Sequence, residues 1–259
     1  MKAGGGILGL VVVLASLFLP RLLGGGGQGF AGSDDPSLSG ADVGPVACQT
    51  EIEQILCGAV EDVSDYWVAE YPRLWNEPYE EARTVFFNGA TNTGCGQASA
   101  QIGPFYCPAD GLVYFDLDFL LQMQQQFGAT GDLAAQYIVA HEYGHHVQNV
   151  LGVSRDVSRL QQQNPGMANQ YSVALELQAD CFAGAWARSA DERTLLEQGE
   201  ISEALNAAAA VGDDRIQSQS GMSVDPDSFT HGTSEQRVQW FRRGYDTADP
   251  RRCTTFEEL

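Results

Sequence analysis

Positive charge is scarce in this chain of 259 residues, where 14 Lys and Arg stand against 34 Asp and Glu. The formal net charge is −20 at pH 7. A nucleic-acid partner requires a basic surface, so this composition argues against nucleic-acid binding. The same imbalance disfavours electrostatic docking on anionic lipid and favours solubility outside the cell.

Long apolar runs are confined to the N-terminus, where Ile7–Leu19 is apolar except for Ala15 and Ser16. Residues 1–23 are therefore expected to be either a membrane anchor or a signal segment that is removed after export. Residues 24–45 are rich in Gly, Ser, Asp and Pro and are expected to form a flexible linker. Both alternatives place one folded domain, residues 46–259, outside the cytoplasm.

The chain has six cysteines but no Cys-x-x-Cys pair, which argues against a zinc ribbon. Disulfides suit an exported chain better. Cys95 and Cys107 bracket a short loop between two strand-like runs, so we expect them to pair. Cys48 and Cys57 are not expected to pair, because one helix over Gln49–Glu70 would separate them by about 13 Å.

Histidine is rare as well, with four in the chain, yet two of them form the string His141-Glu142-Tyr143-Gly144-His145. Apolar residues at helical spacing predict a helix over Asp132–Leu151, which puts both histidines on one face, where they can bind one zinc ion. Glu142 is turned away from the metal and can take a proton from a metal-bound water. Gly144 costs about 1 kcal/mol in a helix, which indicates a close approach by another segment. The alternative is a surface helix with solvated histidines.

A third metal ligand is expected from a second helix, Tyr171–Arg188. Glu176 and Asp180 are four residues apart there, among apolar neighbours, and such an acid pair is costly unless metal or hydrogen bonds satisfy it. We expect Glu176 to bind the metal and Asp180 to hold a ligand histidine from behind. A solvated acidic stripe is the alternative.

Three strings together resemble those of the bacterial neutral zinc metallopeptidase family: His-Glu-Tyr-Gly-His-His-Val-Gln (141–148), Glu-Leu-Gln-Ala-Asp-Cys-Phe-Ala-Gly (176–184) and His-Gly-Thr-Ser-Glu-Gln-Arg (231–237). That family is similar to the gluzincins, whose zinc is held by two histidines and a glutamate. The resemblance implies a zincin-like domain with one zinc per chain. It implies His141, His145 and Glu176 as the ligands and Glu142 as the catalytic base.

The same resemblance, which runs from about Cys95 to Phe256, bears on the rest of the chain. It favours a retained N-terminal anchor, and hence a single-pass membrane protein with an extracytoplasmic domain, over secretion after signal cleavage. It also implies a disulfide between Cys181 and Cys253, with a buried free thiol at Cys181 as the alternative.

The remaining pattern predicts an α+β domain, mostly helical with a small sheet. Thr84–Phe87 and Leu112–Leu117 are strand-like, and one of them could receive an extended peptide by strand addition. Ile201–Val211 and Thr233–Tyr245 are expected to be helices, the second with capping-box spacing between Thr233 and Gln236.

His231 and Arg237 are expected to complete the site from the C-terminal side. His231 precedes a capped helix, where a short loop can present an imidazole that stabilises developing negative charge. Arg237 could orient that loop or hold a substrate carboxylate. A surface histidine and an ordinary helix arginine are the alternatives.

The sequence therefore predicts a zinc metallopeptidase that acts on a peptide or protein substrate. Peptide bonds would be hydrolysed by a metal-activated water with Glu142 as general base. The alternatives are a non-catalytic, zinc-stabilised envelope protein in binding or assembly, and an amidase that acts on cell-wall peptides. The sequence makes no prediction of oligomeric state.

Overall fold

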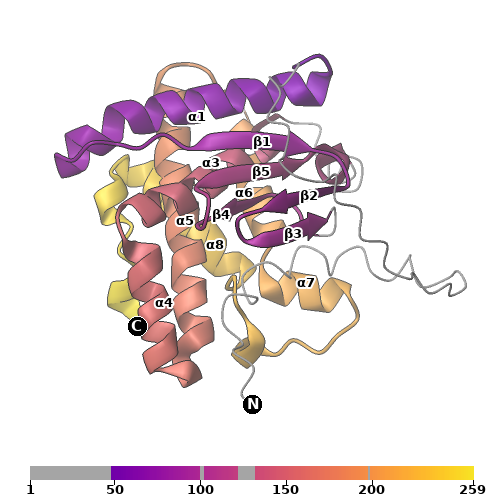
Figure 1. Cartoon of the computed structure of the whole chain (residues 1–259), viewed down its shortest axis with the longest axis vertical. Coiled ribbons are helices and arrows are strands. Elements are labelled where there is room, and N and C mark those ends of the chain that lie inside the picture. The colour runs from indigo at the N-terminus through magenta and orange to yellow at the C-terminus, as the bar shows by residue number, and fades with distance from the viewer. Residues whose placement is uncertain (1–47, 100–101, 122–131, 198) are drawn as a thin grey trace, which may run out of the picture.

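A computed structural model of the protein describes residues 48–99, 102–121, 132–197 and 199–259. The predicted leader and linker, residues 1–45, lie outside these residues. Helices dominate the described part, and a small sheet lies beside them (Figure 1). The expected α+β class is therefore confirmed. Within the described part, no helix is both long enough and apolar enough to cross a membrane.

The sheet has the strand order β1-β5-β4. β1 (Arg83–Phe87) and β5 (Leu112–Asp116) are parallel neighbours, and β4 (Phe105–Cys107) joins β5 in antiparallel fashion at the edge. The two predicted strands are thus confirmed as the paired strands β1 and β5. β2 (Ala90–Thr93) and β3 (Gly96–Ser99) form a separate antiparallel hairpin.

Helix α1 (Glu51–Trp75) runs along the sheet and begins at a capping box, in which Thr50 and Glu53 satisfy each other's backbone N–H groups. Its buried side chains, which include Leu56, Val63 and Trp67, belong to the main hydrophobic core. The other helices are α3 (Asp132–Val150), α4 (Val153–Gln163), α5 (Ala168–Glu192), α6 (Glu200–Ala210), α7 (Asp213–Gln219) and α8 (Ser234–Thr247). The two helices expected near the C-terminus are confirmed as α6 and α8, and Thr233 with Gln236 forms the predicted capping box of α8.

Small residues let the central helices approach closely. A Cβ atom on Gly144 of α3 would lie 3.1 Å from the backbone oxygen of Ala179 on α5, which confirms the predicted close approach. α5 and α8 are closer still, because a Cβ on Gly244 would lie 1.8 Å from the backbone oxygen of Cys181. Helix α5 is therefore held on two sides by backbone contact, which leaves little freedom in the placement of its side chains.

Three disulfides cross-link the described chain. Cys95–Cys107 was predicted from the loop between strands, and Cys181–Cys253 was implied by the family resemblance; both are present. The expectation that Cys48 and Cys57 do not pair was wrong, because they form a disulfide with a Cα–Cα distance of 6.3 Å. The helix begins only at Glu51, and Cys48 lies outside it with a φ of 37°, so the chain turns back beside the first helical turns.

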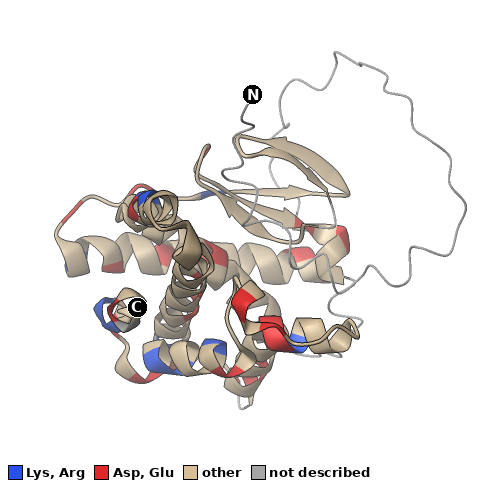
Figure 2. Ribbon diagram, turned by 90° about the horizontal axis from the view of Figure 1, so that it is seen from below, with Lys and Arg blue, Asp and Glu red and all other residues tan. Residues whose placement is uncertain are grey.

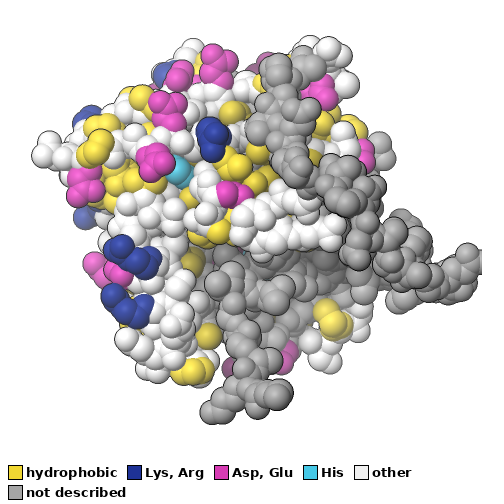
Figure 3. Space-filling view, in the orientation of Figure 1, with side chains coloured by type: hydrophobic (Ala, Val, Ile, Leu, Met, Phe, Trp, Pro, Cys, Tyr) yellow, Lys and Arg dark blue, Asp and Glu magenta, His cyan; other side chains and the backbone are white. Residues whose placement is uncertain are grey.

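Charged side chains are spread over the fold. Figure 2 shows Asp and Glu positions along most helices, with fewer Lys and Arg positions among them. On the face shown in Figure 3, the Lys and Arg side chains of the described residues lie singly or in small groups.

The contact between α5 and α8 leads to a stability prediction. Gly244→Ala should lower the free energy of unfolding by about 1–3 kcal/mol or more, because the added methyl group overlaps the Cys181 carbonyl. Equilibrium urea unfolding with intact disulfides measures the change.

Gly58→Ala is the matched control, since Gly58 lies inside α1 and a Cβ there has nothing within 4 Å. This substitution should raise stability by up to about 1 kcal/mol through helix propensity alone. Equal effects of the two substitutions would contradict the close packing of α5 on α8.

Candidate metal centre

Three side chains meet where α3 crosses α5. His141 and His145 lie one turn apart on α3, and Glu176 faces them from α5. One ligand atom from each lies within 4.8 Å of the others, so the three could hold a metal ion. The Nε2 atom of His141 is 3.2 Å from Glu176 Oε2, and that of His145 is 3.4 Å from Glu176 Oε1. Two imidazoles and a carboxylate are a donor set of catalytic zinc sites, so these residues fit the metal implied by the resemblance.

Asp180 binds the ring nitrogen of His141 that faces away from Glu176. The Nδ1 atom of His141 lies 2.9 Å from Asp180 Oδ1, and Asp180 also accepts hydrogen bonds from Arg237 and Tyr137. Burial alone would raise the pKa of the Asp180 carboxyl, but the charges of Arg237 and His141 hold this pKa below its usual value. Asp180 therefore stays ionised, and it fixes both the ring orientation and the tautomer of His141.

Arg237 reaches this carboxylate from α8. Its Nε atom is 2.7 Å from Asp180 Oδ2, its Nη1 donates to the carbonyl of Val211, and its side chain is 3% exposed. Of the two roles expected for Arg237, holding a substrate carboxylate does not fit this burial. The guanidinium faces a protein carboxylate because the close contact of α8 with α5 buries this turn of the helix.

Glu142 is buried beside the group of three but does not belong to it. Burial raises the pKa of its carboxyl, while the neighbouring His145 and His141 lower it. The backbone N–H of Tyr106 on the edge strand β4 also lowers the pKa of this carboxyl. The arrangement places a carboxylate with a raised pKa between the possible metal ligands and the edge of the sheet.

His231 lies on the loop between α7 and α8. Its Nδ1 atom is 3.4 Å from Asp213 Oδ1, and the carboxylate of Asp213 accepts the backbone N–H groups of Thr230, His231 and Gly232. Burial raises the pKa of Glu176, yet the charges of His231 and His145 and the hydrogen bonds of His141 and His145 hold it well below its usual value. His231 is thus close enough to act on Glu176 electrostatically, although it is not one of the three grouped residues.

Several residues near the site were given no role from the sequence, among them Tyr137, Asp213 and His146. Asp213 fixes the His231 loop, and its sequence signal was the string Gly-Asp-Asp-Arg (212–215), which also resembles the family, although no role was assigned to it. His146 donates from Nε2 to the carbonyl of Glu80 at 2.6 Å, and its Nδ1 atom lies 3.3 Å from the hydroxyl of Tyr106. His146 therefore connects α3 with the edge strand β4. The sequence shows that it is adjacent to His145, but it does not show these distant partners.

The buried pair of Arg237 and Asp180 leads to a prediction for the metal-free protein. Arg237→Leu should lower the free energy of unfolding by about 3–5 kcal/mol, because it leaves the Asp180 carboxylate buried without its cation. Chemical denaturation in the presence of a chelator measures this change.

The matched control is Arg159→Leu on α4, where the arginine and its partner Asp156 are 62% and 52% exposed. This substitution should change stability by less than about 1 kcal/mol. If both substitutions lower the free energy of unfolding equally, the buried pair contributes no more to stability than an exposed one.

Comparison with known proteins gives relatives that carry no assigned activity. The chain is 51% identical over 193 residues to the Escherichia coli (strain K12) protein named "Uncharacterized protein YpfJ", a match that covers 74% of this chain and 67% of the relative. It is 49% identical over 189 residues to "Uncharacterized protein Rv2575" of Mycobacterium tuberculosis (strain ATCC 25618 / H37Rv), covering 69% of this chain and 63% of that relative. The chain therefore spans about two thirds of the length of these relatives.

No solved structure matches the chain at a significant level. A family model described as "Putative neutral zinc metallopeptidase" matches residues 1–256, which extends the expected match from Cys95 to the start of the chain. The grouping of His141, His145 and Glu176 agrees with that description. The chain belongs to this family of neutral zinc metallopeptidases.

Proposed function

We propose that the domain hydrolyses peptide bonds, with one zinc ion held by His141, His145 and Glu176 and with Glu142 as general base. The observation that carries the proposal is the burial of Glu142 directly beside a His-His-Glu donor set. Structural zinc sites have four protein ligands, whereas three protein ligands with an open position are typical of catalytic sites. A buried acid beside such a set has no use in a purely structural site.

When bound, zinc supplies Lewis acidity that lowers the pKa of water and polarises a carbonyl group. The proton chemistry is the task of Glu142. Its carboxylate accepts a proton from the attacking water and then delivers that proton to the leaving amine. Burial, which raises the pKa of Glu142, suits this double role because the group must both accept and release a proton.

His231 is proposed to donate a hydrogen bond to the carbonyl oxygen of the scissile peptide as negative charge develops there. Such a donor contributes a few kcal/mol, on the order of 3, only if it is fixed before the reaction. Asp213 supplies that rigidity, because its carboxylate accepts three consecutive backbone N–H groups of the loop and lies next to the imidazole.

The substrate class proposed is an extended peptide or protein segment. β4 is an edge strand, paired in the sheet with β5, and the backbone N–H of its Tyr106 lowers the pKa of the Glu142 carboxyl. A segment that adds to this edge by backbone pairing would bring its peptide groups alongside the proposed base. A cell-wall peptide amidase would use the same residues and is the nearest alternative.

An extracytoplasmic location is proposed together with this activity. All six cysteines are paired in disulfides, and such bonds persist in oxidising compartments. Residues 1–23 are proposed to anchor the domain to the membrane, with cleavage and secretion as the alternative.

The central prediction concerns Glu142→Gln. This variant should keep about one zinc per chain, the stoichiometry expected of the wild-type protein, but lose hydrolysis of a mixed peptide library by about 10²–10⁴-fold, because an amide cannot accept the proton of water. Metal analysis and library cleavage with and without chelator measure both properties.

Two controls frame this experiment. Glu61→Gln, an exposed position on α1, should leave both properties unchanged, and His145→Ala should lose the zinc. If Glu142→Gln retains hydrolysis, Glu142 is not the base; if it loses the zinc, its role is structural.

A second prediction tests His231. His231→Ala should retain zinc and thermal stability while turnover falls by about 100-fold, because one hydrogen-bond donor to the developing oxyanion is removed. Turnover within about threefold of wild type would exclude a catalytic role for His231.

A further inference from the structure

The Nδ1 atoms of His141 and His145 have different hydrogen-bond partners. The Nδ1 atom of His145 lies 2.9 Å from the side-chain oxygen of Gln148, which follows on the next turn of α3. His141 is held by a carboxylate, whereas His145 is held by a neutral amide that is fully buried. A buried amide is fixed only if its nitrogen and its oxygen both have partners.

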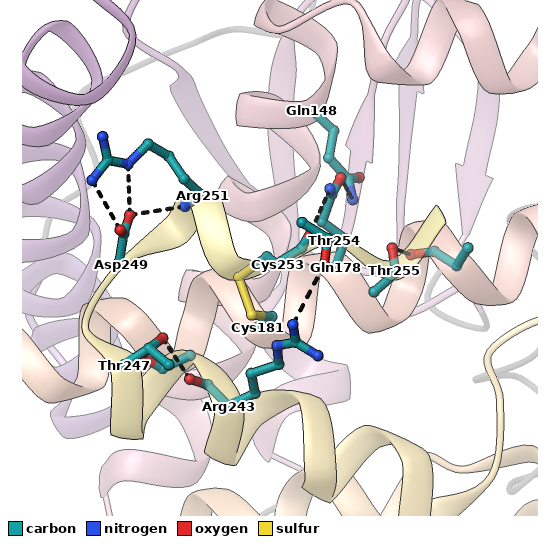
Figure 4. The surroundings of a disulfide bond; sticks show 12 residues. Gln148, Gln178, Cys181, Arg243, Thr247, Asp249, Arg251, Cys253, Thr254 and Thr255 are labelled. Atoms are coloured by element: carbon teal, nitrogen blue, oxygen red, sulfur yellow. Dashed lines mark hydrogen bonds and ion pairs between the residues drawn. A yellow bond between two sulfur atoms is a disulfide. The ribbon is translucent and has the colours of Figure 1, made fainter. Parts of the chain in front are cut away.

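The partners of Gln148 form a chain that ends at the C-terminal segment (Figure 4). The side-chain nitrogen of Gln178 donates to the carbonyl of Cys253 at 2.8 Å, and Gln178 Oε1 in turn accepts from Gln148 at 3.1 Å. The nitrogen of Gln148 also donates to the carbonyl of Leu175 at 2.7 Å. Backbone carbonyls only accept hydrogen bonds, so they dictate which end of each amide is nitrogen.

The direction of this chain determines the proton on His145. Because the nitrogen of Gln148 is committed to Leu175 and Gln178, only its oxygen can face the imidazole. The Nδ1 atom of His145 must then carry a proton. Nε2 is left as the nitrogen that faces Glu176 and that can bind a metal.

The carbonyl at the end of the chain is itself firmly held. Cys253 is bonded to Cys181 of α5, and two residues later the hydroxyl of Thr255 donates to the carbonyl of Ala174 at 2.7 Å. Both Cys253 and Thr255 are buried. The segment thus lies against the same helix that carries Glu176.

We infer that Gln148 and Gln178 are positioning residues, which make the disulfide-anchored C-terminal segment part of the metal centre by orienting His145. The inference rests on the proposed function, because it takes His145 to be a metal ligand. Neither glutamine belongs to the group of three possible ligands. Gln148 acts through its hydrogen bond to His145, and Gln178 acts through its hydrogen bond to Gln148.

The test is the zinc affinity of the full chain with its disulfides intact, measured by competition with a chromophoric chelator. Gln148→Leu should weaken zinc binding by about 10–100-fold, since it removes the acceptor of the His145 proton. Gln178→Leu should weaken it less, by about three- to tenfold, because Leu175 still orients Gln148. The absorption spectrum of the cobalt-substituted protein should shift in both variants, since it reports the geometry of the ligands.

Gln161→Leu is the matched control, because it removes a glutamine whose side-chain nitrogen donates to the carbonyl of Ala168 and the hydroxyl of Ser172, outside the chain of amides. It should lower thermal stability but leave zinc affinity within about twofold of wild type. An unchanged affinity in Gln148→Leu overturns the inference, as does an equal loss in Gln161→Leu and Gln178→Leu. If Gln148→Leu does not fold, Gln178→Leu and its control decide the question.

Failure of the proposed function gives a separate result. A wild-type protein that binds no zinc contradicts both the proposed function and the inference. A wild-type protein that binds zinc tightly while all three variants match it contradicts the inference alone.

Discussion

The backbone contact of Gly144 on α3 with Ala179 on α5 is the constraint on which the metal centre depends. On each helix the functional pair is four residues apart, and the small residue stands just before its second member. The crossing therefore brings the ligand pair of α3 and the acidic pair of α5 face to face, at a distance that one larger side chain would increase. Because α8 is packed against the other side of α5, this geometry is shared by all three helices.

Charge balance explains why so many ionisable groups can be buried together. The carboxylates of Glu142, Glu176 and Asp180 are buried around one guanidinium, that of Arg237. If all four are ionised and the histidines are neutral, two negative charges remain. In the metal-free protein, burial lowers the pKa of His141 and His145, but Asp180 and Glu176 raise it above the usual value, so protonated histidines can compensate these charges. Buried charges are costly without compensation, and a divalent cation held by neutral histidines would supply it as well.

Local patterns in the sequence predicted most of the helices and strands that build the site. Helical spacing predicted the helices that bear His141 and Glu176, and the capping pair predicted the start of α8. The errors and omissions have two physical origins, an irregular turn and contacts between distant segments. Cys48 pairs with Cys57 because of a backbone turn before the helix, and the partners of Arg237 and His146 lie 57 and 66 residues away. Periodicity contains no information about such contacts.

The order of the parts along the chain has a consequence for biogenesis. Glu176 is the last in sequence of the three residues that could hold a metal. The groups proposed to orient them, the guanidinium of Arg237 and the carbonyl of Cys253, come later in the sequence. Synthesis begins at the N-terminus, so the three residues that could hold a metal are made well before the groups proposed to orient them. On this proposal, the centre reaches its final geometry only when the segment around Cys253 folds back onto α5.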